Sequence, residues 1–140
     1  MKLKIKKLHP DAEIPHFANP GDAGMDLYVP ERVTLMPGER KTVDLGLALE
    51  IPDGYVGLMF DKSGPSHLHG IKTFGGVIDS GYRGEIHAGV MNLSDRSFVF
   101  EKGHKIVQIL IQKVEHPDIV VVKKLSKTNR GAKGFGSTGR

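Results

Sequence analysis

Short runs of apolar residues, either alternating with polar ones or rich in β-branched side chains, lie along the chain between turn-forming residues. Both patterns are typical of β-strands. The runs cover residues 2–8, 42–51, 55–60, 86–93, 97–101, 105–114 and 119–125. The turns between them include Asn19-Pro20-Gly21, Pro37-Gly38, Pro52-Asp53-Gly54 and Lys102-Gly103. Many short strands with regular turns predict an all-β barrel or sandwich.

Helical periodicity is almost absent. No segment keeps the 3.6-residue apolar period of a long helix, and one short helical turn is expected near residues 66–69. The last stretch, SKTNRGAKGFGSTGR, is rich in glycine and has Phe135 as its one large apolar residue. Such a segment buries too little surface to order itself. We therefore predict a single β-domain over residues 1–125 and a flexible arm over residues 126–140, where the simplest interpretation is a disordered tail.

Composition excludes several kinds of chemistry. The 140 residues are the usual size of one domain and contain no cysteine, so disulfides, thiolate zinc sites and cysteine nucleophiles are excluded. The absence of cysteine fits a reducing, cytoplasmic location. No apolar run approaches about 18 residues, and the basic N-terminus is not followed by a signal-peptide core, so no membrane partner is expected. The net charge of +4 suits an anionic partner such as a nucleotide, or only a solvated surface.

Three local patterns carry candidate chemistry. Gly134-x-Gly136-x-x-Gly139 matches the glycine spacing of a dinucleotide-binding fingerprint. That fingerprint requires a helix after the glycines, and the sequence ends one residue after Gly139. The same segment can still wrap phosphates through its N–H groups, hydroxyls and cations, with Phe135 stacked on a base. His67-x-His69 resembles a metal pair, although two histidines without a third ligand are more often a surface loop. Neither pattern decides the function by itself.

Residues 75–85 have the third pattern, that of a β-hairpin with an Asp79-Ser80-Gly81 turn. A tight hairpin presents backbone donors and acceptors at fixed positions, which can read the flat edge of a base. An acid at its turn can orient a water molecule. The hairpin interpretation and a functional role for Asp79 are therefore compatible.

Five segments, in order, resemble the five motifs of the trimeric dUTPase family. They are residues 23–28 (AGMDLY), 61–64 (DKSG), 76–85 (GVIDSGYRGE), 103–110 (GHKIVQIL) and 130–139 (RGAKGFGSTG). The resemblance covers nearly the whole chain. It implies a jelly-roll-like, β-clip dUTPase fold. It also implies that the protein hydrolyses dUTP to dUMP and pyrophosphate. This reaction limits uracil incorporation into DNA and supplies dUMP for thymidylate synthesis. The resemblance further implies Mg²⁺ as cofactor and a homotrimer whose arm reaches a neighbour's site.

The resemblance also implies roles for residues in the first four motifs. Asp26 helps hold the water shell of Mg²⁺. The triphosphate is contacted from the second and fourth motifs, by Lys62, Ser63, Gly64 and Gln108. The backbone of the third motif and of the strand that follows it reads uracil, at Gly76, Val77, Ile78 and His87. Asp79 is the catalytic residue that orients or deprotonates the attacking water, and Tyr82 packs under the deoxyribose and excludes a 2′-OH.

In the fifth motif, Arg130 binds the terminal phosphates and Phe135 covers the uracil. Gly136, Ser137 and Thr138 close on the phosphates. The chain departs from the family pattern mainly at Lys62, where arginine is usual, because lysine is a point charge without the planar fork that binds phosphate in two places.

Three other functions compete with this interpretation. A dCTP deaminase shares the fold, but its catalytic glutamate aligns with Gly89 here. A small β-barrel that binds nucleic acid fits the basic charge, but aromatic residues are only 6% of the chain and form no stacking cluster, so no stable nucleic-acid binding is expected. A regulator of partner proteins stays open as an added role.

Overall fold

The computed structural model describes residues 1–134, which form ten strands and one short π-helical turn. The all-β prediction is confirmed. The elements are β1 (Lys4–Lys7), β2 (Met25–Tyr28), β3 (Val33–Leu35), β4 (Arg40–Glu50), β5 (Tyr55–Asp61), η1 (Gly64–Leu68), β6 (Ile71–Phe74), β7 (Val77–Ile78), β8 (Glu85–Asn92), β9 (Phe98–Phe100) and β10 (Lys105–Lys113). The helical turn expected near residues 66–69 is η1, displaced by one or two residues.

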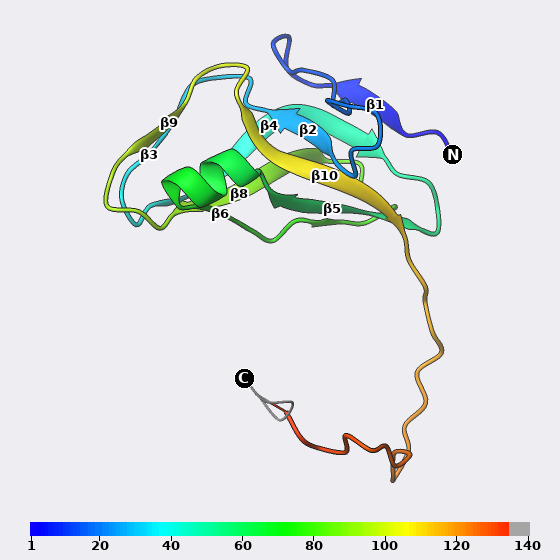
Figure 1. Cartoon of the computed structure of the whole chain (residues 1–140). Coiled ribbons are helices and arrows are strands. Elements are labelled where there is room, and N and C mark those ends of the chain that lie inside the picture. The colour runs from blue at the N-terminus through cyan, green and yellow to red at the C-terminus, as the bar shows by residue number, and fades with distance from the viewer. Residues whose placement is uncertain (135–140) are drawn as a thin grey trace.

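The strands build three antiparallel sheets. Two have four strands each, in the orders β1-β4-β8-β6 and β2-β10-β5-β7, and the third is the β3-β9 ribbon. The ribbon lies at the end of the body away from the point where the chain leaves β10 (Figure 1). Strand β10 lies between β2 and β5 and pairs with both. The first, second and fourth motifs, which are distant in sequence, are therefore neighbours in this sheet.

The core lies between the two larger sheets and consists mainly of aliphatic side chains. The largest fully buried ones include Leu27, Leu35, Leu45, Leu47, Leu49, Ile86, Ile106 and Ile109. Strand β4 contributes many of them and contains an irregularity between Asp44 and Ala48. Gly46 lies inside it with φ 67°, and an added Cβ would meet the Cβ of His9 at 2.5 Å. Glycine therefore lets the N-terminal segment pack closely onto β4.

Two expectations from the sequence are wrong. Residues 119–125 form no strand, and the last strand ends at Lys113. Five aliphatic side chains in this stretch are instead 54–94% exposed, because the chain runs away from the body where no strand of the described chain can pair with it (Figure 1). Residues 75–85 also do not form a paired hairpin. β7 pairs with β5, whereas β8 pairs with β4 and β6, so the turn crosses from one sheet to the other.

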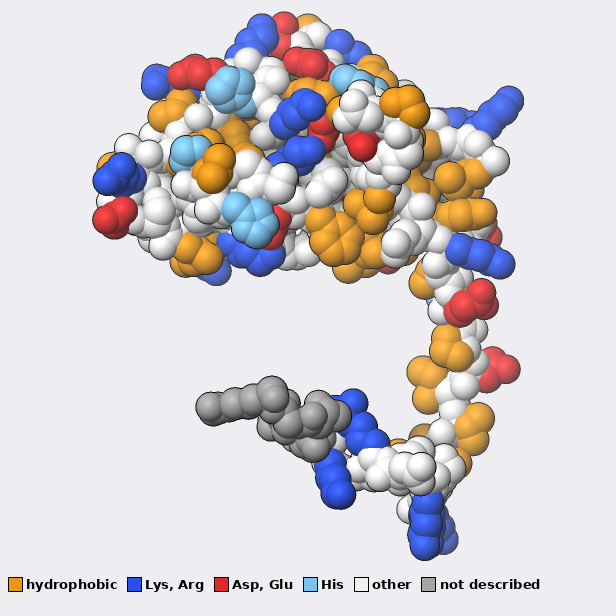
Figure 2. Space-filling model, viewed as in Figure 1, with side chains coloured by type: hydrophobic (Ala, Val, Ile, Leu, Met, Phe, Trp, Pro, Cys, Tyr) orange, Lys and Arg blue, Asp and Glu red, His pale blue; other side chains and the backbone are white. Residues whose placement is uncertain are grey.

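No helix within residues 1–134 is long and apolar enough to cross a membrane. The space-filling view shows the C-terminal segment projecting from the body, with Lys and Arg side chains near its described end (Figure 2). Residues 115–134 are all exposed.

Candidate active site

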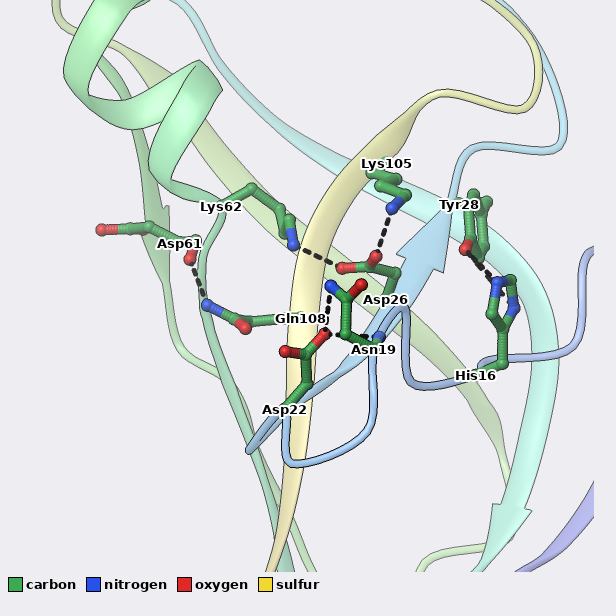
Figure 3. Close-up of polar contacts among 9 residues, drawn as sticks. All are labelled: His16, Asn19, Asp22, Asp26, Tyr28, Asp61, Lys62, Lys105 and Gln108. Carbon is green, nitrogen blue, oxygen red and sulfur yellow. Dashed lines mark hydrogen bonds and ion pairs between the residues drawn. The ribbon is translucent and has the colours of Figure 1, made fainter.

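Asp26 is the centre of one group of polar residues. It lies on β2, opposite Gln108 of β10, and is only 2% exposed. Lys62 Nζ is 2.5 Å from its Oδ1, and Lys105 Nζ is 2.6 Å from its Oδ2. The two ammonium groups approach from different sides (Figure 3). A buried carboxylate is thus balanced by two cations from different strands.

Each charged residue of this group stabilises the ionised form of its partner. Burial acts to raise the pKa of Asp26, but the Lys105 and Lys62 ammonium groups outweigh it and leave that pKa below its ordinary value. The Asp26 carboxylate in turn raises the pKa of Lys105. Oδ2 is fully buried, and the Lys105 ammonium is its close charged contact among residues 1–134. Asp26 is therefore ionised at neutral pH.

Close packing joins the first, second and fourth motifs. Gln108 Nε2 donates a hydrogen bond to the backbone oxygen of Asp61 at 2.9 Å. A Cβ on Gly24 would lie 2.8 Å from Gln108 Oε1, so glycine leaves the space that this side chain needs. Lys62 and Ser63 follow β5 directly, and Ser63 caps η1 without a side-chain hydrogen bond. Its hydroxyl is thereby left available beside Lys62.

The third motif forms a separate pocket of about 190 Å³. It is lined by Val77, Ile78, Asp79, Tyr82, Glu85, Ile86 and His87. Tyr82 N donates to Asp79 O at 3.1 Å, which closes the turn between the two sheets. Gly76, with φ 98°, packs against Met59 and accepts a hydrogen bond from Met59 N at 2.8 Å. His87 Nδ1 lies 2.8 Å from Asp44 Oδ1, so its imidazole is held from β4.

The two groups do not meet within one chain. β7 pairs with β5 at Gly57 and Leu58, whereas Lys62 lies just beyond the far end of β5. The four residue-to-residue steps from Leu58 to Lys62 span roughly 13 Å. Arg130 lies in the projecting segment, where its Nε donates to Lys133 O at 3.0 Å. Phe135, Gly136, Ser137 and Thr138 lie outside the described residues.

A larger cavity of about 540 Å³ lies beside Leu8, His9, Glu31 and Arg32. It contains none of the residues predicted for the site. Its charged groups already have partners, such as His9 with Glu31 and Arg32 with Glu101. We therefore assign the site to the two groups above and not to this larger cavity.

Some residues of these groups were not identified from the sequence. Lys105 is the most important, because its contact with Asp26 arises from the pairing of β2 with β10 and no local pattern reveals it. Asp44 and Glu85 support the third-motif pocket in a similar way. Glu85 Oε1 accepts a hydrogen bond from Gly46 N at 2.7 Å, which ties the start of β8 to the irregularity in β4.

A magnesium ion fits the Asp26 group. Mg²⁺ keeps several of its waters and is commonly bound through one or two carboxylates together with substrate phosphates. Asp26 supplies one ionised, buried carboxylate, whose Oδ2 has the Lys105 ammonium at 2.6 Å but no hydrogen bond of normal geometry within residues 1–134. Within residues 1–134, no three histidine or acidic side chains gather into a metal cage, and His67 and His69 accordingly have no third ligand. The donor set matches a metal that arrives with phosphates.

Comparisons with known proteins identify the family of the chain. A sequence model described as dUTPase matches residues 10–139. A relative from Nautilia profundicola, named deoxyuridine 5′-triphosphate nucleotidohydrolase, is 46% identical over 100% of both chains. Its namesake from Thermobifida fusca is 44% identical over 99% of this chain and 79% of the relative. The solved structure of the Staphylococcus bacteriophage 80alpha dUTPase with dUPNHPP has a TM-score of 0.93 at 30% identity, covering 99% of each chain. By sequence and by fold, the chain belongs to the dUTPase family.

Proposed function

We propose that the protein hydrolyses dUTP to dUMP and pyrophosphate. The observation that carries this proposal is the third-motif pocket, where Asp79, Tyr82 and His87 line one cavity of about 190 Å³. The relatives from Nautilia profundicola and Thermobifida fusca are named for this reaction, and the bacteriophage 80alpha enzyme was solved with a dUTP analogue. Membership of the same family supports the same substrate here.

In the proposed reaction, Asp79 accepts a hydrogen bond from a water molecule and takes its proton as the water attacks the α-phosphorus. The bond from this phosphorus to the bridging oxygen breaks, and pyrophosphate leaves with the electron pair. Asp79 suits this role because its carboxylate is exposed and lies at the turn that lines the pocket. When bound, Mg²⁺ neutralises charge on the triphosphate, and Asp26 would hold its water shell.

Base and sugar are selected by different parts of the same pocket. Backbone groups of Gly76, Val77 and Ile78, with those of His87, would read the edge of uracil. Tyr82 would lie under the deoxyribose, where its ring leaves no room for a 2′-OH. Lys62, Ser63, Gly64 and Gln108 would contact the phosphates from the other group of residues.

The separation of the two groups supports a site shared between copies, which in the homotrimer implied by the family resemblance would lie between neighbouring chains. Within one chain, the third-motif pocket and the Asp26 group are separated by the part of the chain from Leu58 to Lys62, which spans roughly 13 Å. A neighbouring copy that supplies the other group would complete the site. The aliphatic side chains of residues 119–125 are exposed in the single chain and would be covered by another copy. Arg130 and the rest of the arm, residues 126–140, would then close over a neighbour's site.

A deaminase is disfavoured by packing at β8. An added Cβ on Gly89 would meet the backbone oxygen of Phe74 at 2.8 Å, so the glutamate that a dCTP deaminase needs at this position has no room. Pyrophosphate release from dUTP, dCTP, dTTP and UTP, with Mg²⁺ and with excess chelator, tests the proposal. We expect rapid release from dUTP with Mg²⁺ only. Comparable turnover of dCTP or UTP would contradict the proposed specificity.

A further inference from the structure

Asp26 is held by two cations that contact different oxygen atoms. Lys62, just after the end of β5, has its Nζ 2.5 Å from Oδ1. Lys105, at the start of β10, has its Nζ 2.6 Å from Oδ2 (Figure 3). The two contacts are independent, because each oxygen has its own ammonium group. One lysine can therefore leave without removing the other.

Lys62 has one positive charge to divide between Asp26 and a triphosphate, so a phosphate contact weakens its ion pair with Asp26 even though its ammonium has three donors. Its ammonium is a single point charge, and the proposed function assigns that charge to phosphate. When Lys62 moves to the phosphates, Lys105 becomes the one cation of the described chain that still contacts Asp26. A carboxylate that is 2% exposed is costly to leave without a cation or a hydrogen-bond donor. The Asp26 carboxylate therefore depends most on Lys105 for its stabilisation when the substrate is bound.

The backbone around Lys105 is suited to a fixed role. Lys105 pairs with Tyr28 at the end of β2, and the chain shifts register between Lys105 and Val107. Just before it, His104 O accepts a hydrogen bond from Val29 N at 3.0 Å. Lys62, in contrast, lies where β5 gives way to the Ser63-Gly64 loop before η1. Lys105 is anchored to the same strand as Asp26, and Lys62 is not.

We propose that Lys105 is a positioning residue, which holds the Asp26 carboxylate in place for the metal-bearing triphosphate while Lys62 exchanges Asp26 for phosphate. This inference rests on the proposed function, because it assumes that a metal–nucleotide complex binds beside Asp26. Residues that orient a metal-binding group in this way typically contribute about 10–100-fold to metal affinity.

The test uses Mn²⁺ as probe, with the α,β-imido analogue of dUTP so that no turnover is needed. Mn²⁺ affinity of the protein–analogue complex is measured by electron paramagnetic resonance. We expect about 10–100-fold weaker Mn²⁺ binding for Lys105→Met and substantial recovery in Lys105→Arg. Lys102→Met is the matched control, because Lys102 also forms an ion pair near the start of β10, but with the exposed Asp11. It should bind Mn²⁺ as the wild type does.

A double-mutant cycle separates a role through Asp26 from a general loss of structure. In an Asp26→Asn background, Lys105→Met should weaken Mn²⁺ binding by less than about twofold, because the partner charge is already gone. A tenfold loss in that background would overturn the proposal, as would unchanged Mn²⁺ affinity in Lys105→Met alone. If Lys105→Met is unfolded, Lys105→Gln takes its place, both alone and combined with Asp26→Asn, and the same outcomes decide. A wild-type protein that does not bind Mn²⁺ with the analogue would overturn the proposed function itself, which is a distinct result.

Discussion

Tyr82 donates its hydroxyl hydrogen to the backbone oxygen of Glu85 at 2.8 Å, and this hydrogen bond draws its ring across Gly84. An added Cβ on Gly84 would overlap the Tyr82 ring, with 2.6 Å to Cζ. The ring is therefore fixed at both ends: its own backbone closes the Asp79 turn, and its hydroxyl reaches β8. A side chain held so firmly can exclude a group by its position as well as by its size.

Tyr82→Ala should lower the preference for dUTP over UTP. Without the ring, a 2′-OH has room, and discrimination should fall by about 10–100-fold. Tyr82→Phe keeps the ring and loses only the hydrogen bond to Glu85, so it should retain most of the preference. The measurement is kcat/KM for dUTP and UTP on each variant. Equal preference in wild type and Tyr82→Ala would mean that another group guards the sugar.

Asp79→Asn should remove the proposed base while nearly keeping the shape of the turn. Loss of a general base typically costs about 10²–10⁴ in rate. We expect kcat to fall by that factor, with the α,β-imido analogue still bound at close to wild-type affinity. Steady-state kinetics and calorimetric titration measure the two effects separately. If kcat stays within about threefold of wild type, a different group activates the water.

Lys62→Arg should improve phosphate binding. Arginine offers a planar fork that can donate two parallel hydrogen bonds to phosphate, whereas lysine offers one point charge. In the ligand-free protein it can also keep the ion pair with Asp26. We expect kcat/KM for dUTP to rise by roughly three- to tenfold, mainly through a lower KM, and to fall in Lys62→Met. A lower kcat/KM in Lys62→Arg would show that the packing around Asp26 suits lysine better than arginine.

Acid should weaken the fold partly through Asp61. Burial acts to raise its pKa, but hydrogen bonds from Lys72 and from Thr73 outweigh it and hold the pKa below 3.8. Because the folded-state pKa is the lower one, the contribution to stability is present above about pH 4 and is lost as the pH falls through the folded pKa. The drop in Tm between about pH 6 and about pH 3 should therefore be smaller in Asp61→Asn than in wild type. Equal drops would assign the acid sensitivity to other carboxylates.

The fold class was predictable because alternation and turn residues are local signals. Long runs such as those in β4, β5, β8 and β10 are close to the predicted ranges. Some strands of two to four residues, such as β3 and β7, carry too little pattern to be recognised, although β1 and β9 were covered by predicted runs. Residues 119–125 show the opposite error. Their aliphatic side chains have the composition of a strand, but strand formation requires a partner, and the described chain provides none there.

The site was only partly predictable for a similar reason. Asp79 and Tyr82 belong to one continuous segment, so the resemblance could identify them together, and the structure places both at one pocket. Lys105 belongs to the Asp26 group only because β2 and β10 are adjacent. The sequence motif contains Lys105 but does not reveal its partner. Contacts between distant strands depend on register, which a single sequence leaves open.

Deleting residues 129–140 should impair chemistry far more than folding. Within the described part of this segment, contacts are local, such as Gly131 N donating to Thr128 O and Arg130 to Lys133 O. Residues 129–134 contribute no core side chain, so the shortened protein should keep its native mass and melt nearly as before without ligand. Arg130 would act as charge develops on the departing phosphates, so kcat should fall and not only KM rise. Phe135→Ala should be milder, because stacking on a base is worth about 1–3 kcal/mol.

Deleting residues 115–140 is the informative comparison, because it also removes Ile119, Val120, Val121, Val122 and Leu125, all of them exposed in the single chain. If these side chains pack on another copy, this longer deletion should lower the native mass from a trimer toward a monomer and reduce Tm, whereas the shorter one should not. Light scattering and thermal melting of both proteins decide between the two roles. An unaltered trimer after the longer deletion would mean that the sheets alone hold the copies together. A normal kcat after the shorter deletion would reduce residues 129–140 to the disordered tail that their composition alone predicts.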